Sequence, residues 1–420
     1  MNNIDDAKSY LDCVNCGKCL PVCPTYNISL NEFYSPRGRT RLVLKDNALP
    51  GALNPTKVND SLSKCLLCGR CSSICPNGVK VDELIINEKS KIKGFKGGWP
   101  SKESFALKAL EIKGKSTLNF ALRASGFPLV KKIINRNVPS PSGKPFISGP
   151  DTVFKSLNGS SGLRVGYFSG CVFNGVYPHV SQGTVLSLTK NGIEVAVPSA
   201  QGCCGLPFLS SGDIKSFKEL AIKNALSFKN KGFDYIVTSC ASCSYSIKRL
   251  YLLYFGEEDK NYIDILDFSN KLYDVWVFFK TVSKEGLKIR EGKLEVGFDA
   301  VFHIPCHLKT AEGFKPSSQT ESIIGEAGFI ADKILGLNIK PLKHDLCCGN
   351  GGMFNIRHYD LSKEITIRKF EDINEASPQK ILTSCSGCMV SLMDQKGIMK
   401  TGKEIPVEHL ISTYALSLKL

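Results

Sequence analysis

Residues 13–24 read CVNCGKCLPVCP, and residues 65–76 read CLLCGRCSSICP. Both stretches follow one pattern, C-x2-C-x2-C-x3-C-P, with a glycine after the second cysteine. Three cysteines spaced two residues apart bring three thiolates to one centre, whereas the fourth lies beyond the reach of that loop. The repeated stretch therefore predicts a pair of metal sites in which each copy supplies its last cysteine to the other.

This spacing is the bacterial pattern for [4Fe–4S] cubanes, in which the fourth cysteine ligates the neighbouring cluster. We expect one cubane on Cys13, Cys16, Cys19 and Cys75, and a second on Cys65, Cys68, Cys71 and Cys23. Pro24 and Pro76 follow the exchanged ligands and end the turn there. Zinc also binds C-x2-C pairs, but it would use two pairs rather than four regularly spaced cysteines that end in proline.

The chain has 420 residues, 18 cysteines and a formal charge of +15. This length predicts two or three domains. The start, MNNIDDAKSYLDC, lacks the basic and apolar regions of a secretory signal, and no apolar run of about 18 residues occurs. We therefore expect a cytoplasmic protein, with peripheral attachment to the inner face of the membrane as the alternative. Thiols stay reduced in the cytoplasm, so this many cysteines indicate metal binding rather than disulfides.

The positive charge has two interpretations. Bound thiolate clusters are anionic and would offset part of it. Nucleic-acid binding is the competing interpretation, but no nucleic-acid motif accompanies the charge, so no nucleic-acid partner is expected. Much of the charge falls in residues 89–136, where the stretches ESFALKALEIKG and NFALRASGFPLVKKIINR predict amphipathic helices. A solvated connector is the simpler interpretation, and a docking face for a partner or an anionic membrane surface is the alternative.

The organisation predicts an α+β protein of several domains. Residues 1–90 form a mainly helical domain around the two quoted stretches, and residues 91–161 form a basic helical connector with a linker rich in Pro, Gly and Ser. From about residue 162 strands alternate with helices, which predicts parallel βαβ units. We expect two such α/β domains, over 162–290 and 291–420.

These two domains are an internal repeat with matching cysteines. IVTSCASC at 236–243 corresponds to ILTSCSGC at 381–388, and QGCCGLPF at 201–208 corresponds to DLCCGNGGMF at 345–354. The first set is Cys171, Cys203, Cys204, Cys240 and Cys243, and the second is Cys306, Cys347, Cys348, Cys385 and Cys388. Because the intervals also correspond, the chain repeats a site and not only a scaffold.

Each cysteine of these sets follows the end of a predicted strand, where ligands bind in parallel α/β folds. Five thiolates exceed what zinc or one cubane needs, and adjacent cysteines suit different irons of a larger cluster. Gly205 and Gly349 let the backbone approach that cluster closely. The simpler interpretation is that these cysteines only pack as small buried hydrophobic residues. That interpretation does not explain why five positions match in both repeats. With the two N-terminal sets, all 18 cysteines are assigned.

The N-terminal stretches resemble the iron–sulfur subunit of glycolate oxidase and of related lactate and glycerol-3-phosphate dehydrogenases. The C-terminal repeats resemble the cysteine-rich CCG domains of the same group, which are shared with heterodisulfide reductase. This resemblance implies one or two noncubane [4Fe–4S] clusters in the CCG domains, with zinc at one of them as the alternative. Glycolate oxidase subunits often lose cysteines from the C-x2-C pairs, whereas this chain keeps both pairs. That departure favours the branch related to heterodisulfide reductase, or anaerobic relatives of lactate dehydrogenase.

The resemblance implies an iron–sulfur electron-transfer subunit of an oxidoreductase complex. An FAD-containing dehydrogenase partner would oxidise a 2-hydroxy acid such as glycolate or lactate, and the electrons would pass to a quinone or another carrier. The sequence has neither a G-x-G-x-x-G motif nor a P-loop, so the flavin is expected on another subunit. A membrane quinone-reducing subunit is a further partner in that case. The alternative is a catalytic subunit that cleaves a disulfide at the CCG clusters, with a b-type cytochrome as partner. A zinc-stabilised interaction module is the third hypothesis.

Two further groups of residues are weaker candidates. Arg37, Arg39 and Arg41 lie between the cubane motifs, where they either compensate cluster charge or are ordinary solvated arginines. His303, His307 and His344 lie near the second CCG cysteines, where they either relay protons and donate to sulfur or make routine hydrogen bonds. The sequence assigns no acid–base catalytic residue.

Overall fold

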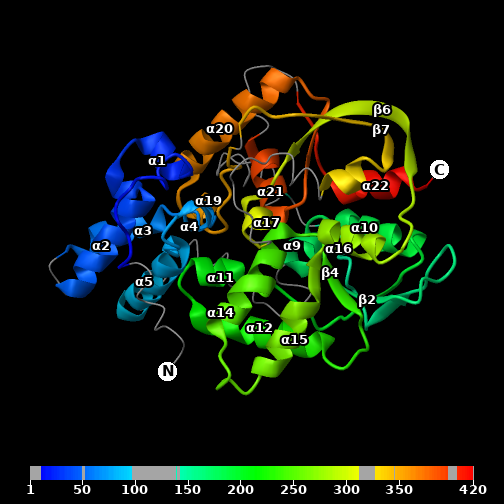
Figure 1. Ribbon diagram of the computed structural model, residues 1–420, viewed down its shortest axis with the longest axis horizontal. Coiled ribbons are helices and arrows are strands. Elements are labelled where there is room, and N and C mark those ends of the chain that lie inside the picture. Colours follow the sequence, from blue (N-terminus) through cyan, green and yellow to red (C-terminus); the bar gives the residue numbers. More distant parts are fainter. Residues whose placement is uncertain are drawn as a thin grey trace.

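The computed structural model describes residues 11–49, 53–96, 139, 142–311, 327–344, 346–395 and 404–419. The amphipathic helices expected within 103–136 lie outside these residues. Figure 1 shows a helical N-terminal part beside two α/β units. Within the described ranges, no helix combines the length and the apolar character needed to cross a bilayer.

The N-terminal part consists of short helices that hold the two cysteine loops. They are α1 (Pro24–Ser29), the 3₁₀ turn η2 (Glu32–Tyr34), α2 (Pro36–Ala48), α3 (Pro55–Ser63), α4 (Arg70–Ile74) and α5 (Val81–Lys96). Proline opens three of these helices, because its missing N–H costs nothing at the first helical position. The Ser35 hydroxyl caps α2 by accepting from the Gly38 N–H at 2.9 Å. Helix α5 continues beyond residue 90, the predicted end of this domain.

The first α/β unit is built on a five-stranded sheet of order β1-β3-β2-β4-β5. Its strands are β1 (Thr152–Phe154), β2 (Arg164–Phe168), β3 (Glu194–Val197), β4 (Tyr235–Thr238) and β5 (Leu272–Asp274). The last four are parallel, as the alternation of strands and helices predicts, and β1 adds an antiparallel edge to β3. The sheet therefore begins before residue 162, the predicted start of this domain.

Helices cover this sheet and connect its strands. They are α9 (Gly170–Gly175), α10 (Pro178–Lys190), α11 (Leu206–Ser210), α12 (Ile214–Phe228), α13 (Ala241–Tyr245), the π-helical turn η3 (Ser246–Tyr251), α14 (Leu252–Tyr254), α15 (Tyr262–Lys271) and α16 (Val275–Lys284). Phe168, Phe228 and Phe268 pack together in the core with ring centroids 5.1–6.1 Å apart. This aromatic cluster fixes α12 and α15 against the sheet.

The second α/β unit repeats the order of the four parallel strands of the first. Its four parallel strands, in the order β7-β6-β8-β9, are β6 (Gly292–His303), β7 (Ile334–Lys340), β8 (Lys380–Thr383) and β9 (Val407–His409). Its helices are α17 (Cys306–Ala311), α19 (Phe354–Arg357), α20 (Tyr359–Ala376), α21 (Ser386–Gln395) and α22 (Leu410–Ser417). Together with the helical N-terminal part, the two units confirm the α+β multidomain fold class.

The two units pack against each other through α10 and α22, which lie side by side in Figure 1. Gly183 of α10 permits this approach, because a Cβ there would lie 3.4 Å from both Ala415 Cβ and Ser412 Cα of α22. The His409 imidazole Nε2 also lies 2.8 Å from the Ser239 carbonyl oxygen at the end of β4. These contacts bring the carboxyl ends of β2 and β4 in the first sheet towards those of β6 and β8 in the second.

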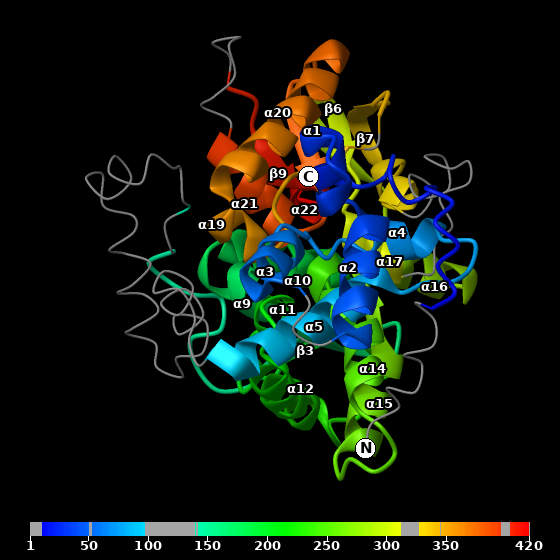
Figure 2. The ribbon, with the colours of Figure 1, turned by 90° about the vertical axis from the view of Figure 1, so that its left-hand side faces the viewer.

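The N-terminal part lies against both units (Figure 2). Lys89 of α5 is buried and donates to the Ser210 carbonyl oxygen of the first unit at 3.2 Å. The Arg368 guanidinium of the second unit donates to the Asn27 carbonyl oxygen at 2.9 Å. The N-terminal cysteine loops are thereby held next to the repeated units.

Candidate iron–sulfur sites

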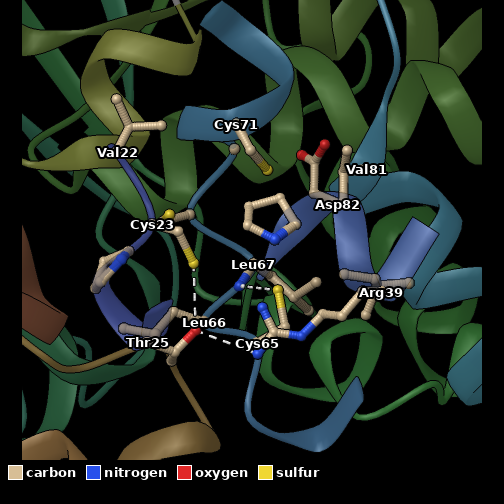
Figure 3. A pocket seen from close by; sticks show the side chains of 15 residues that line it. Val22, Cys23, Thr25, Arg39, Cys65, Leu66, Leu67, Cys71, Val81 and Asp82 are labelled. Atoms are coloured by element: carbon tan, nitrogen blue, oxygen red, sulfur yellow. Dashed lines mark hydrogen bonds between the residues drawn. The ribbon is translucent and has the colours of Figure 1, made fainter. Parts of the chain in front are cut away.

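One cavity in the N-terminal part collects cysteines from both copies of the motif. Its lining includes Cys23, Cys65, Cys68 and Cys71. Figure 3 shows Cys23, Cys65 and Cys71 around it, with Leu66, Leu67 and Val81 as apolar wall. Cys23 reaches this cavity because it caps the start of α1, away from its own loop. The structure thus brings together the four cysteines predicted for the second cubane.

A second cavity collects the other set. Its lining includes Cys13, Cys16, Cys19 and Cys75. Asn15 and Gly17 have positive φ angles of 57° and 80°, which curl the loop tightly around this space. Cys75 follows the end of α4 and belongs to the opposite motif. The last cysteine of each motif therefore lies in the cavity of the other motif, as the spacing predicts.

Burial disfavours the ionised form of these thiols. Burial raises the pKa of Cys19 to about 11. Burial also raises the pKa of Cys71, and the nearby Asp82 carboxylate adds to that shift. Thiolates are the form that ligates iron, so this crowding of thiols needs metal charge to stabilise the ionised state. The donor set and the enclosed spaces fit iron–sulfur clusters.

Two of the three candidate arginines lie at these cavities. Arg39 is buried with 1% exposure and lines the cavity of Cys23 and Cys65. Arg37 lines the other cavity, donates to the Asn15 carbonyl oxygen at 3.0 Å and pairs with Glu32. Arg41 is exposed. Arg39 therefore brings a buried guanidinium to one cysteine set, whereas the charge of Arg37 is paired with Glu32.

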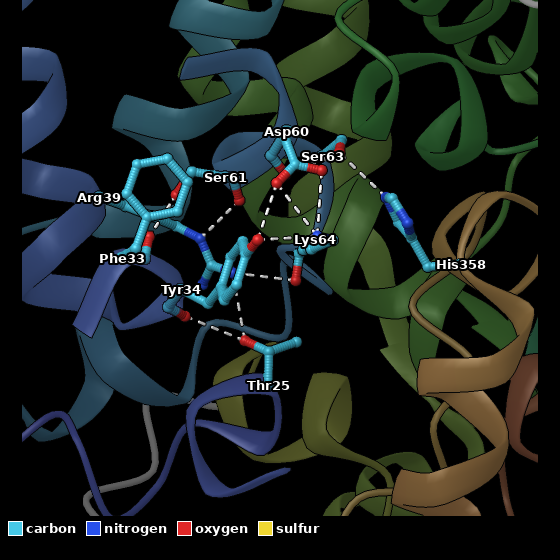
Figure 4. A network of polar contacts seen from close by, with 9 residues as sticks. All are labelled: Thr25, Phe33, Tyr34, Arg39, Asp60, Ser61, Ser63, Lys64 and His358. Atoms are coloured by element: carbon cyan, nitrogen blue, oxygen red, sulfur yellow. Dashed lines mark hydrogen bonds and ion pairs between the residues drawn. The ribbon is translucent and has the colours of Figure 1, made fainter. Parts of the chain in front are cut away.

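A polar network fixes Arg39 (Figure 4). Its guanidinium donates to the Ser61 carbonyl oxygen at 2.9 Å, the Lys64 carbonyl oxygen at 3.0 Å and the Thr25 hydroxyl at 3.2 Å. The network continues to His358 of the second unit, whose Nε2 lies 2.9 Å from the Ser63 hydroxyl. Arg39 thereby ties α1, α2 and α3 together around one cysteine set.

The ten later cysteines form one continuous series of interacting thiols. In the first unit Cys171 interacts with Cys203, Cys203 with Cys204, Cys204 with Cys243, and Cys243 with Cys240. In the second unit Cys306 interacts with Cys347, Cys347 with Cys348, Cys348 with Cys388, and Cys388 with Cys385. The two halves have the same order, and each joins cysteines from three strand ends, as predicted.

The two halves meet at Cys240 and Cys385, whose side chains interact directly. A serine from the opposite unit contacts each sulfur: Ser386 Oγ lies 3.1 Å from Cys240 Sγ, and Ser242 Oγ lies 3.1 Å from Cys385 Sγ. The sequence offered no signal for this meeting, because neither serine matches a ligand pattern. We call the whole series, from Cys171 to Cys306, the thiol ladder.

The second unit also meets the N-terminal cysteine sets. Burial raises the pKa of Cys68, and the proximity of Cys306 and Cys347 raises it further. The Thr310 hydroxyl of α17 donates to the Cys68 carbonyl oxygen at 3.3 Å. The Cys306 end of the thiol ladder therefore lies beside the cavity of Cys23 and Cys65.

His307 connects this cavity to the middle of the ladder. Its Nε2 lies 3.3 Å from the Leu67 carbonyl oxygen, and its Nδ1 lies 2.9 Å from the Ser242 hydroxyl. The ring stacks on Tyr245 with centroids 4.6 Å apart, and Tyr245 donates to Asp82 at 2.9 Å. Burial lowers the pKa of His307, and the hydrogen bond with Leu67 acts in the opposite direction.

The other two candidate histidines differ from each other. The buried His303 lies at the end of β6 beside Cys348 and Cys388. His344 lies in the loop before Cys347, where its backbone N–H donates to Asp372 at 3.1 Å.

Comparison with known families agrees with this division of the chain. Residues 9–79 match the 4Fe-4S dicluster domain family. Residues 165–248 and 300–393 each match the cysteine-rich domain family, CCG. The matched segments contain all the cysteines of the two cavities and of the thiol ladder.

Three curated relatives are similar over long stretches. The probable glycolate oxidase iron-sulfur subunit of Bacillus subtilis is 27% identical over 94% of this chain and 91% of its own length. A fumarate reductase (CoM/CoB) subunit of Methanothermobacter marburgensis is 26% identical over 93% of this chain and 68% of its own. Lactate utilization protein A of a Geobacillus species is 27% identical over 59% of this chain and 97% of its own. The chain belongs to the iron–sulfur proteins that join a 4Fe-4S dicluster domain to two cysteine-rich CCG domains.

Proposed function

We propose that the chain is the iron–sulfur electron-transfer subunit of an oxidoreductase complex. The observation that carries this function is the continuity of its cysteine sets. The set of Cys13 to Cys75 includes the exposed Cys16, and Cys71 lines both N-terminal cavities. The next set lies beside Cys306, and the thiol ladder then runs across both units. Iron–sulfur clusters bound to such sets supply one-electron transfer.

The residues of this chain hold the clusters and adjust their environment. We assign two [4Fe–4S] cubanes to the two N-terminal cavities, with the eight cysteines that line them as ligands. We assign a noncubane [4Fe–4S] cluster to each half of the ladder, with zinc in one half as the alternative. Arg37 and Arg39 add positive charge near the cubanes, and the apolar walls exclude water. These features set reduction potentials, whereas substrate chemistry takes place elsewhere.

The partner we infer is an FAD-containing dehydrogenase that oxidises a 2-hydroxy acid, glycolate or lactate. Relatives named as a glycolate oxidase iron-sulfur subunit and as a lactate utilization protein support this substrate class. The exposed loop around Cys16 is the entry point we propose for its electrons, because it is the solvent-facing end of the series. A quinone-reducing subunit or another carrier at the membrane's inner face would receive them.

A second function is favoured by one observation. Cys240 and Cys385 bring the two halves of the ladder into contact, so metal groups bound there would lie on either side of one point. Such a pair suits a two-electron substrate, and the relative named as a fumarate reductase (CoM/CoB) subunit supports this alternative. In that case the chain itself cleaves a disulfide, with each half of the ladder delivering one electron.

Anaerobic purification of the complex from its native host separates the two functions. EPR spectra recorded before and after addition of glycolate or D-lactate should show reduced iron–sulfur signals, and removal of the flavoprotein should abolish that reduction. Reoxidation of the reduced chain by a disulfide in the absence of any partner would instead favour the second function. Protein that contains zinc and no labile sulfide would contradict both.

A further inference from the structure

The two CCG units differ at the residue that ends the central strand of each sheet. Strand β2 ends at Phe168, which is in register with Thr238 of β4. Strand β6 ends at His303, which is in register with Thr383 of β8. Since β2 and β6 are the corresponding central strands of the two sheets, Phe168 and His303 occupy equivalent places. Phe168 packs among aromatic rings, whereas His303 brings two ring nitrogens to the same place.

His303 lies among thiols of the second half of the ladder. A ring nitrogen of His303 and the sulfurs of Cys348 and Cys388 all lie within 4.8 Å of one another. The two sulfurs are 3.2 Å apart. All three residues are buried, with exposed fractions of 1%, 6% and 5%. This spacing is small enough for one metal atom to contact all three side chains.

The backbone holds these groups in place through a separate set of hydrogen bonds. The Thr383 hydroxyl donates to the His303 carbonyl oxygen at 3.0 Å, which fixes the end of β6. The Thr366 and Ser391 hydroxyls donate to the Cys348 carbonyl oxygen at 2.9 Å and 2.6 Å. The position of His303 is therefore built into the sheet, and no loop movement is needed to bring it to the sulfurs.

We propose that His303 is a nitrogen ligand of the metal group at the second CCG site. This inference rests on the proposed function, because it takes that group to be an iron–sulfur cluster. Imidazole and thiolate are the donors that iron and zinc share in proteins. The second site then has a Cys–His donor set, whereas the first site offers cysteine alone around the apolar Phe168. The two halves of the ladder are thus unequal despite their repeated cysteines.

The inequality has a consequence for the reduction potentials. Where histidine takes the place of cysteine at an iron–sulfur cluster, the potential rises, because a neutral nitrogen donates less negative charge than a thiolate. The second site, which adjoins Cys68, is then more easily reduced than it would be with cysteine ligands alone. Replacement of His303 by cysteine, which puts a thiolate in place of the neutral imidazole, should lower that potential.

The decisive measurement is pulsed EPR on anaerobically purified chain labelled with ¹⁵N-histidine. A strongly coupled histidine nitrogen should appear in the wild type, and it should disappear in His303→Phe while remaining in His307→Gln. The wild-type spectrum needs no variant, so the test holds even if His303→Phe folds poorly. Cluster signals with no strongly coupled histidine nitrogen would overturn the proposal and leave the electron-transfer function standing.

If the second site holds zinc, the electron-transfer assignment of that site fails, but His303 is still tested. Zinc X-ray absorption should then show a nitrogen ligand at a Zn–N distance of about 2.0 Å, together with sulfur ligands at about 2.3 Å. That nitrogen shell should be lost in His303→Phe and kept in His307→Gln. A shell of sulfur alone would overturn the proposal.

Discussion

The thiol of Cys240 in the first CCG unit interacts directly with the thiol of Cys385 in the second. Metal groups bound on either side would share this contact. We therefore expect Cys385→Ser to change the EPR or Mössbauer signature of both CCG sites. Cys306→Ser, at the far end of the ladder, is the matched control and should change the second site only. Unaltered first-site signals in Cys385→Ser would show that the two sites do not communicate.

Because each N-terminal motif supplies its last cysteine to the other cavity, replacement of that cysteine should remove the cluster of the other motif only. Cys23 lies in the cavity of Cys65, although it belongs to the other motif in sequence. Cys23→Ser should remove about four iron atoms per chain and should leave the signal of the cluster at Cys16 intact. Cys16→Ser should give the reverse pattern. Iron and labile-sulfide analysis with EPR checks both variants, and loss of the Cys16 cluster in Cys23→Ser would disprove the exchange.

Arg39 is expected to be essential for the stability of the N-terminal part. Its guanidinium donates three hydrogen bonds, two of them buried, and Arg39→Met removes all three. Arg39→Met should lower the free energy of unfolding by about 3 kcal/mol. Arg41→Met, at an exposed position on the same helix, should change it by less than about 0.5 kcal/mol. Denaturant titration measures both, and equal effects would refute the role of the network.

Gly349 is required by the backbone next to Cys348. It has φ of +80°, and a Cβ there would lie 2.5 Å from both the Ser362 carbonyl oxygen and the Thr366 hydroxyl. Gly349→Ala should destabilise the chain by at least ~2 kcal/mol, through backbone strain and displacement of α20. Gly143→Ala, where no atom lies within 4 Å and φ is not positive, is the control. The Tm and the iron content should both fall in Gly349→Ala, and neither should change in Gly143→Ala.

His358 makes the contact between the N-terminal part and the second unit sensitive to acid. Burial lowers its pKa to about 4, from an unfolded value near 6.5. The unfolded chain therefore binds more protons between these values, so this contribution to stability is complete above pH 6.5 and is lost as the pH falls towards 4.

The Tm of the wild-type chain should accordingly decrease between pH 7 and pH 5 by more than that of His358→Gln, which keeps a side chain able to bond Ser63. Parallel slopes for the two proteins would mean that another group is responsible for the acid sensitivity.

The N-terminal cavities could be predicted because the information is local. Cysteine spacing and the following prolines determine which thiols a tight loop can gather, and Cys23 and Cys75 had to leave their own loops. The strand-end positions of the later cysteines were also predictable, since parallel strands collect their carboxyl ends at one edge. The edge strand β1 was not predicted, because its three residues carry no periodic signal.

The relations between units could not be read from the sequence. Arg39 and Arg41 look equivalent there, and only the face of α2 that meets α3 buries one and exposes the other. His303 and His344 both precede a ladder cysteine closely, yet only His303 stands at a strand end beside the sulfurs. The contact of Cys240 with Cys385 depends on how α10 and α22 orient two sheets, and no local pattern specifies that orientation.

The mirrored order of the thiol ladder is the order that a two-fold axis would generate. A single repeat with this surface would pair with a second copy of itself through the same patch, as isologous homodimers do. The covalent chain thus preserves the geometry of such a dimer within one polypeptide. A homodimer must accept every substitution twice, whereas a fused pair is free to change one copy alone. The phenylalanine and the histidine that end the two central strands are such a divergence, and fusion is what permits one half to acquire chemistry that the other lacks.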